Sequence, residues 1–180
     1  KLIMETERRG KDATGLYQVY EDSFWTALKK GDKASSFLFN TRSEKDPVVY
    51  QDMLEHWGAH TEDLKAVVAH CRARTIGPEH NNENNHPVIM QVDPRNAILG
   101  VHNGTLTNHE AIFDKLKYIK RFGQVDSEAL FMLLYHYTNG GKAPIDIEAV
   151  TKTVRALEGS YAVVTMNSAF PDTVATFRNG

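Results

Sequence analysis

The feature that most restricts the fold is a pair of short β-favouring runs near the start of the chain. Residues 16–20 and 24–28 combine aromatic and aliphatic side chains, and only Glu21, Asp22 and Ser23 separate them. Two such runs joined by a short polar turn are typical of a β-hairpin. The sequence therefore predicts an antiparallel sheet, whose apolar face needs a second layer to cover it.

More strands are predicted where short apolar runs recur. Residues 66–69 and 97–101 are continuous apolar runs, which are typical of buried strands. Two further strands are expected at residues 161–166 and 174–177. Residues 77–87, which lie between the runs at 66–69 and 97–101, are rich in Asn and carry a proline near each end, so they are predicted to form a loop.

Helical signals are strongest in the second half of the chain. Thr107 lies three residues before Glu110, the spacing of a capping box, and apolar residues follow at helical spacing up to residue 119. Residues 127–137 carry a second apolar helical face. The order of these elements indicates a mixed α and β domain with helices covering sheets.

Three weaker predictions complete the secondary structure. Asp146 can cap a helix that ends near residue 157, with Ile147 facing inward. Residues 50–57 are expected to form a helix. Residues 37–46 are polar and are expected to be irregular and exposed.

Composition limits both the fold and the function. The chain has 180 residues, a net charge of −2, 41% hydrophobic residues and one Cys, so we expect a single domain over residues 1–180 without a disulfide framework or a Cys-rich zinc site. The near-zero charge argues against a general nucleic-acid binder. No apolar run or signal peptide indicates a membrane or an export route, so we expect a cytoplasmic protein. Since the chain opens at Lys1 inside an apparent helix and stops just after a strand, we expect the natural protein to continue at both ends.

Two polar motifs follow the predicted strands. Arg72 lies within residues 70–77, directly after an apolar strand, where its guanidinium could hold a carboxylate through two parallel hydrogen bonds. Asn103 and Gly104 follow the next strand. An Asn side-chain amide beside a Gly backbone N–H can form an oxyanion hole, although Asn-Gly is also a common hairpin turn.

A third motif precedes the helix at residues 127–137. Asp126 can cap this helix, or its carboxylate can hold the ammonium group of a ligand. The eight histidines and one Cys show no HExxH or CxxC spacing, so we expect neither a metal nor another cofactor.

Taken in order, these motifs resemble the glutaminase domain of class II glutamine amidotransferases, a family of N-terminal nucleophile hydrolases, and most of all the glutaminase half of glucosamine-6-phosphate synthase. The blocks that carry the resemblance are residues 9–15, 70–77, 85–87, 102–110 and 125–128. A weaker match covers residues 157–162 and 171–173. The resemblance implies a four-layer αββα sandwich of two antiparallel sheets.

The resemblance also assigns roles to individual residues. It implies that Arg72 binds the α-carboxylate of glutamine, with a polar contact from Thr75 beside it, and that Asp126 binds the α-ammonium group. Asn103 and Gly104 would form the oxyanion hole. Three residues would support the site: Arg9, near the nucleophile, together with Asn85 and His86.

In this family an N-terminal Cys attacks the side-chain amide of glutamine, releasing ammonia and then glutamate, and its own α-amino group is the base. The α-amine has a pKa of about 7.7–8.0, which suits this task. No such Cys opens the sequence, and Cys71 has no free α-amine and is expected to pack as a small apolar residue. We therefore expect the nucleophile to precede Lys1 in the natural protein.

Two alternatives remain open on the sequence. Ala73 and Ile76 replace a Trp and a His of the family, so the enzyme could act on another amide. A chain without the nucleophile could instead be an inactive amino-acid-binding or structural relative. The expected partners are glutamine and an ammonia-accepting synthase domain or subunit, with a possible homo-oligomer and with neither nucleic acid nor membrane.

Overall fold

The structure is a computed structural model, and it describes residues 2–39, 61–93 and 95–180. Two antiparallel sheets face each other. The first sheet has the order β2-β1-β3, formed by Ala13–Tyr20 (β1), Trp25–Lys30 (β2) and Leu64–Arg72 (β3). The second has the order β4-β5-β6-β7. Its strands are Val88–Asp93 (β4), Asn96–Leu106 (β5), Gly159–Asn167 (β6) and Val174–Asn179 (β7).

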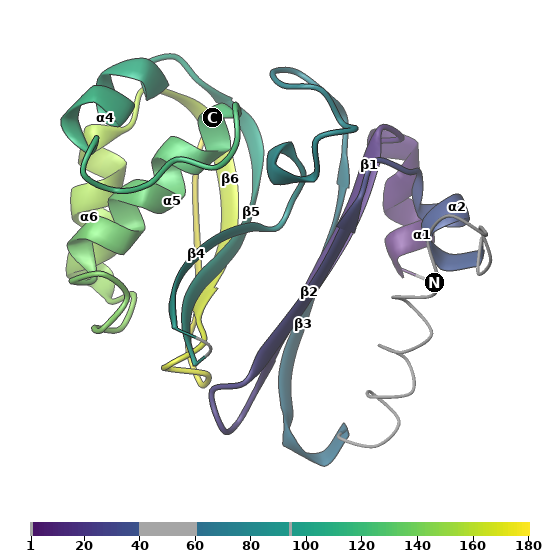
Figure 1. Cartoon of the computed structure of the whole chain (residues 1–180), viewed down its shortest axis with the longest axis horizontal. Coiled ribbons are helices and arrows are strands. Elements are labelled where there is room, and N and C mark those ends of the chain that lie inside the picture. Colours follow the sequence, from purple (N-terminus) through teal and green to yellow (C-terminus); the bar gives the residue numbers. More distant parts are fainter. Residues whose placement is uncertain (1, 40–60, 94) are drawn as a thin grey trace.

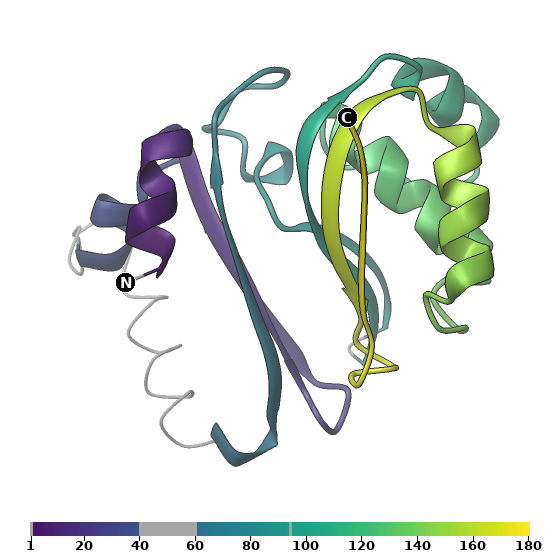
Figure 2. The ribbon, with the colours of Figure 1, turned by 180° about the vertical axis from the view of Figure 1, so that it is seen from behind.

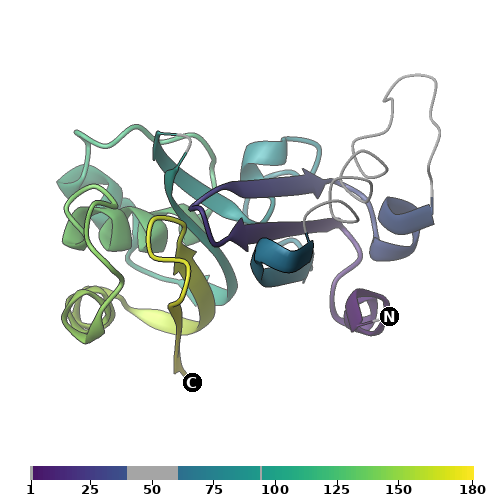
Figure 3. The ribbon, with the colours of Figure 1, turned by 90° about the horizontal axis from the view of Figure 1, so that it is seen from below.

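Helices cover the outer face of each sheet, so the molecule has four layers (Figures 1 and 2). Helices Leu2–Thr6 (α1) and Ala34–Phe39 (α2) lie outside the β1–β3 sheet. Helices His109–Lys115 (α4), Asp126–Tyr137 (α5) and Ile147–Ala156 (α6) cover the other sheet. Seen from below, α1 lies at one end of the molecule and the helices that cover the second sheet lie at the other (Figure 3). The predicted αββα sandwich is confirmed.

Three short 3₁₀ turns complete the description of the backbone. They are formed by Glu7–Arg9, Thr61–Asp63 and Asn82–Asn84. None of the helices in the described ranges is long and apolar enough to cross a bilayer.

The predicted hairpin is formed by β1 and β2, which pair antiparallel with Leu16 opposite Leu28. β1 also pairs with β3 along its whole length and is buried at every position. Between the sheets, Tyr17 and Val19 of β1 pack with Leu99 and Val101 of β5. This apolar layer holds the ends of β3 and β5 at a fixed separation, and both ends carry predicted site residues.

α5 packs on the outer face of β5 because both present apolar surface there. Nine consecutive α5 residues from Asp126 to Leu134 are buried, and Phe131 lies directly over Gly100 of β5. A Cβ on Gly100 would lie 2.0 Å from the ring of Phe131. The close approach fixes how the beginning of α5, with Asp126, sits relative to β5.

Replacing Gly100 with alanine should therefore destabilise the fold. An added methyl group has no space, and overpacking a buried site costs about 1–3 kcal/mol. Urea unfolding of Gly100→Ala measures this loss. Adding Phe131→Leu to the variant should return part of the loss because the smaller side chain makes room. Additive effects of the two substitutions would contradict the contact as the cause.

Several local predictions need correction. The capping box is wrong: α4 has Asn108 as its N-cap without a side-chain cap bond, because the Asn108 side chain bonds Ala156 O and Glu158 N instead. Ile147 is 86% exposed, so it does not face the core. Asp146 does cap α6, accepting a hydrogen bond from Ala149 N at 2.8 Å.

Other predictions are correct only in part. β3 exists, but alternate residues along it are exposed rather than buried, because one face of this strand points away from the other sheet. The 37–46 segment was expected to be irregular, whereas its start belongs to α2. The helix predicted at residues 50–57 lies outside the described residues. β4 was not predicted from the sequence.

Candidate functional site

One pocket collects most of the predicted site residues. It has a volume of about 290 Å³ and lies where β3, β5 and the beginning of α5 meet. Of the predicted residues, Asn85 alone is absent from its wall, and it lies directly behind Arg72. The predicted residues that line the pocket are Arg9, Arg72, Thr75, His86, Asn103, Gly104 and Asp126.

Arg72 is the last residue of β3 and is 4% exposed. Its guanidinium donates to the side-chain oxygen of Asn85 at 3.0 Å and to the carbonyl oxygens of Ile76 and Gly77 at 2.5 and 3.0 Å. These bonds use three of the five N–H groups. Arg72 therefore shapes the loop that carries Thr75, and it keeps two donors for a ligand within the described part of the chain.

The Asn85 side chain holds this loop from behind. It is fully buried, and its amide nitrogen donates to Glu79 O at 2.7 Å. The loop is tied to the block at residues 9–15 as well, because Asp12 accepts a hydrogen bond from Arg74 N at 2.7 Å and its own N–H donates to Arg72 O at 3.1 Å. The blocks at residues 9–15 and 70–77 are thus neighbours in the fold.

Asn103 and Gly104 lie within β5, which continues past them to Leu106. The hairpin-turn alternative for this Asn-Gly pair is therefore wrong. Gly104 has a φ of +144°, and a Cβ there would lie 2.1 Å from Ser160 O on β6. Only glycine fits this position, and the exposed side chain of Asn103 is placed beside it at the pocket.

Asp126 is the first residue of α5 and is 3% exposed. Its Oδ2 accepts a hydrogen bond from Leu106 N at 2.7 Å. The capping alternative is wrong, because the N-cap is Val125 and Asp126 bonds β5 rather than its own helix. A buried carboxylate at the pocket wall, opposite a buried arginine, gives this site one group of each charge.

Three histidines at the pocket were only partly foreseen. His70, His86 and His102 all line it, but only His86 was predicted. His70 lies two residues before Arg72, and strand alternation places such residues on one face, so this signal was present in the sequence. Ser127, whose Oγ lies 2.8 Å from His102 Nδ1, was also missed.

Cys71 faces away from the histidines. Its sulfur contacts Thr6 Oγ1 at 3.1 Å and Ile3 O at 3.5 Å, both from α1. Its 9% exposure is consistent with the prediction that it packs as a small apolar residue. Over the described ranges, no group of three His, Cys, Asp or Glu side chains has an arrangement that could hold a metal ion.

The imidazoles are held in the neutral form. Burial, together with the neighbouring His102 and Arg72, lowers the pKa of His70 to about 4. Burial also lowers the pKa of His86 well below its ordinary value. For His102 burial lowers the pKa, while the negative charge of Asp126 opposes that effect.

These shifts predict acid sensitivity of the fold. His70 binds a proton near pH 6.5 in the unfolded chain but only near pH 4 in the folded one. The contribution of neutral His70 to the free energy of unfolding is therefore fully present above about pH 6.5, and it is lost as the pH falls toward 4. Thermal melts should show a Tm about 4 °C lower at pH 5 than at pH 7. His70→Gln should reduce this difference. An equal pH dependence in both proteins would contradict the assignment to His70.

The comparisons with known proteins agree with this geometry. The chain is 29% identical over 181 residues to glutamine–fructose-6-phosphate aminotransferase (isomerizing) of Shigella flexneri and of Escherichia coli K12, and 27% identical to that of Staphylococcus aureus. Each match covers 99% of this chain and 26% of the relative. The chain is homologous to glutamine amidotransferases. The resemblance predicted from the motifs is thus confirmed, although the chain spans only about a quarter of these relatives.

Solved structures show the same fold. A glutamine phosphoribosylpyrophosphate amidotransferase from B. subtilis superposes with a TM-score of 0.58 at 19% identity, over 93% of this chain and 31% of the other. An allosteric regulatory enzyme of purine biosynthesis gives a TM-score of 0.60 at 19% identity, over 92% and 31%. No protein-family model matches the chain.

Proposed function

We propose that this domain hydrolyses the side-chain amide of glutamine to glutamate and ammonia, as the glutaminase part of an amidotransferase. The observation that carries the proposal is the pocket itself. Segments far apart in the sequence bring a buried arginine, a buried carboxylate and an Asn-Gly pair to one cavity. A zwitterionic amino acid with a distal amide needs these groups in combination.

In this proposal Arg72 and Thr75 bind the α-carboxylate, and Asp126 binds the α-ammonium group. The distal amide then reaches Asn103 and Gly104. When a nucleophile attacks the amide carbon, its oxygen becomes an oxyanion, which the Asn103 amide and the Gly104 N–H stabilise. Arg9, Asn85 and His86 support the pocket.

In this proposal the nucleophile is an N-terminal Cys of the natural protein. Its α-amine takes the thiol proton and passes it to the departing ammonia, and water then hydrolyses the thioester. A second, more apolar cavity of about 520 Å³ shares Asn103 and His70 with the pocket. The proposed oxyanion hole therefore borders both cavities at Asn103.

The natural protein should release glutamate and ammonia from glutamine in equal amounts. N-terminal sequencing of the mature protein should find Cys as its first residue. Failure to release ammonia, or a mature protein with another first residue, would contradict the proposal.

Asp126→Asn should raise the KM for glutamine about 10²-fold, because a buried carboxylate that pairs with a ligand cation contributes about 2–5 kcal/mol. Asparagine keeps an oxygen for Leu106 N, so the fold should survive. The matched ligand is glutaramate, which is glutamine without its amino group. Glutaramate should bind more weakly than glutamine to the wild type, and its affinity should be the same for the wild type and for Asp126→Asn.

The ammonia acceptor is proposed to be bound by a synthase domain or subunit of the same enzyme, acting in the cytoplasm. The homologues named as glutamine–fructose-6-phosphate aminotransferases are longer than this chain, which supports such an arrangement. A homo-oligomer is also proposed, and neither nucleic acid nor a membrane is expected as a partner. A crosslinking and mass-spectrometry experiment on the natural protein identifies the synthase part directly.

A further inference from the structure

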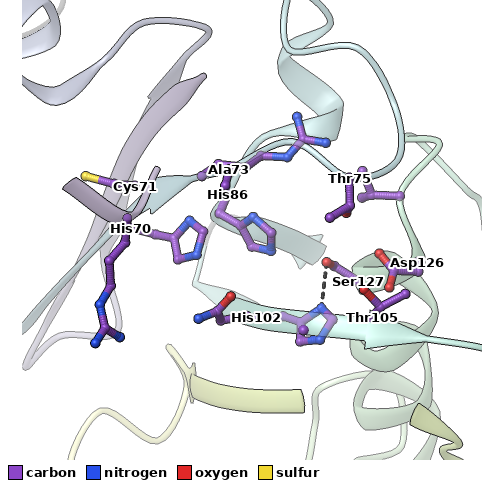
Figure 4. A pocket seen from close by; sticks show the side chains of 14 residues that line it. His70, Cys71, Ala73, Thr75, His86, His102, Thr105, Asp126 and Ser127 are labelled. Carbon is purple, nitrogen blue, oxygen red and sulfur yellow. Dashed lines mark hydrogen bonds between the residues drawn. The ribbon is translucent and has the colours of Figure 1, made fainter. Parts of the chain in front are cut away.

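Three imidazoles form a row across the pocket. His70 projects from β3, His86 from the loop before β4, and His102 from β5, so the row bridges the two sheets. The ring centroids of His70 and His86 are 4.5 Å apart, and those of His86 and His102 are 6.5 Å apart. Figure 4 shows His86 at the centre of the row, with Asp126 and Ser127 on the side away from His70.

Four nitrogens of this row are buried without a hydrogen-bond partner in the described part of the chain. They are both ring nitrogens of His86, Nδ1 of His70 and Nε2 of His102. His86 is only 5% exposed. An unpaired buried polar group costs about 1–3 kcal/mol, and all three histidines line the pocket. A ligand that reaches these nitrogens and pairs with them therefore removes that cost.

The charges around the row decide its protonation. Arg72 and Lys29 place positive charge near His86, and Asp126 places negative charge near His102. Burial and the two cations oppose a further positive charge in the ligand-free pocket. The imidazoles are therefore neutral at pH 7, and each has one donor and one acceptor nitrogen, of which His102 already uses Nδ1 with Ser127 Oγ.

A carboxamide matches a neutral imidazole, because it carries both N–H donors and a carbonyl acceptor. A carboxylate carries only acceptors, and it meets the unprotonated nitrogens with lone pair against lone pair. Once an imidazole is protonated, both of its nitrogens donate. The preference between the two ligands then reverses.

We propose that His70, His86 and His102 make the pocket selective for a distal carboxamide over a distal carboxylate at neutral pH, and that their protonation makes it retain a dicarboxylate amino acid. This inference rests on the proposed function. It gives the site a regulatory property: glutamate leaves readily at neutral pH and is held, as an inhibitor, when the pH falls.

Calorimetric titration of the natural full-length protein, with the N-terminal Cys of our proposal replaced by alanine, tests this without turnover. The probes are L-glutamine and L-glutamate at pH 7.5 and 5.5, where the side chain of free glutamate stays ionised. The ratio of the glutamate Kd to the glutamine Kd should fall about tenfold between these pH values, which is the effect expected when bound glutamate returns the pKa of one imidazole from about 4 to its ordinary value of about 6.5. Glutamate binding should also take up protons from the buffer, whereas glutamine binding should not.

His86→Gln removes the titrating group but keeps one donor and one acceptor, so it should abolish most of the pH dependence. His70→Gln is the second variant, should the first fail to fold. The matched control is His80→Gln, because His80 is an exposed histidine outside the pocket lining and should keep the wild-type response.

The outcomes separate the two proposals. If both ligands bind and their Kd ratio does not change with pH, or if the His86 and His70 variants respond like the wild type, the imidazole inference is wrong and the glutamine pocket stands. If neither ligand binds at either pH, the proposed function of the pocket is wrong, and the inference with it.

Discussion

Asn103→Ala is expected to lower the kcat for glutamine hydrolysis by the natural full-length protein about 10²–10³-fold, with little change in KM. The Asn103 side chain is exposed at the pocket, and in our proposal its amide meets the oxyanion only as the transition state forms. Removing one oxyanion-hole donor has an effect of this size in other hydrolases. Steady-state kinetics of glutamate release measure it.

Asn103→Asp is the matched variant for this prediction. It keeps the size of the side chain but replaces a donor with a negative charge, so its kcat should be at least as low as that of Asn103→Ala. Both variants should melt within about 2 °C of the wild type, because truncating an exposed side chain costs little stability. A loss of activity that follows a loss of folding would instead assign Asn103 a structural role.

Arg72→Ala should lower kcat/KM for glutamine by a factor of at least about 30, and mainly through KM. Truncating one partner of a buried charge pair costs about 2–5 kcal/mol, and the lower end of this range corresponds to about 30-fold in kcat/KM. Arg72→Lys should recover little, since an ammonium cannot reproduce the planar fork that bonds Asn85, Ile76 and Gly77. Initial rates over a range of glutamine concentrations separate KM from kcat.

Arg74→Ala is the control, because Arg74 lies two residues away and is also cationic. Its side chain is 53% exposed and pairs with Glu79 at 2.9 Å, and it takes part in none of the three bonds of the Arg72 guanidinium. It should leave kcat/KM within about threefold of the wild type. Equal losses in the two arginine variants would show that general positive charge, rather than a contact from Arg72, supports the binding of glutamine.

A ligand without the α-carboxylate tests the assigned contact of Arg72 separately from its effect on the loop. The α-amide of L-glutamine should bind weakly, and equally to the wild type and to Arg72→Ala, because neither complex contains the proposed ion pair between Arg72 and an α-carboxylate. If Arg72→Ala weakens this ligand as much as glutamine, Arg72 acts by shaping the loop that carries Thr75.

The types of residue at the site could be predicted from the motifs, because each motif lies within a few consecutive residues. Positions such as Arg72, Asn103 and Asp126 are marked by the predicted elements that precede or follow them, and the chemistry of an amino-acid ligand limits what they can bind. The hairpin and the strands were predictable for the same reason, since their signal repeats within a few residues. The αββα arrangement came from the resemblance and not from these patterns.

What the sequence by itself determined is therefore the list of candidate groups and most of the elements that carry them. Only the tertiary structure decided which groups meet. It placed Asp126 against the backbone of Leu106 rather than at a helix cap, set Asn85 behind Arg72, and aligned His70, His86 and His102 across the two sheets. The physical reason is that these contacts join residues 13 to 20 positions apart, and their geometry is set by the packing of β1 on β5 and of Phe131 on Gly100.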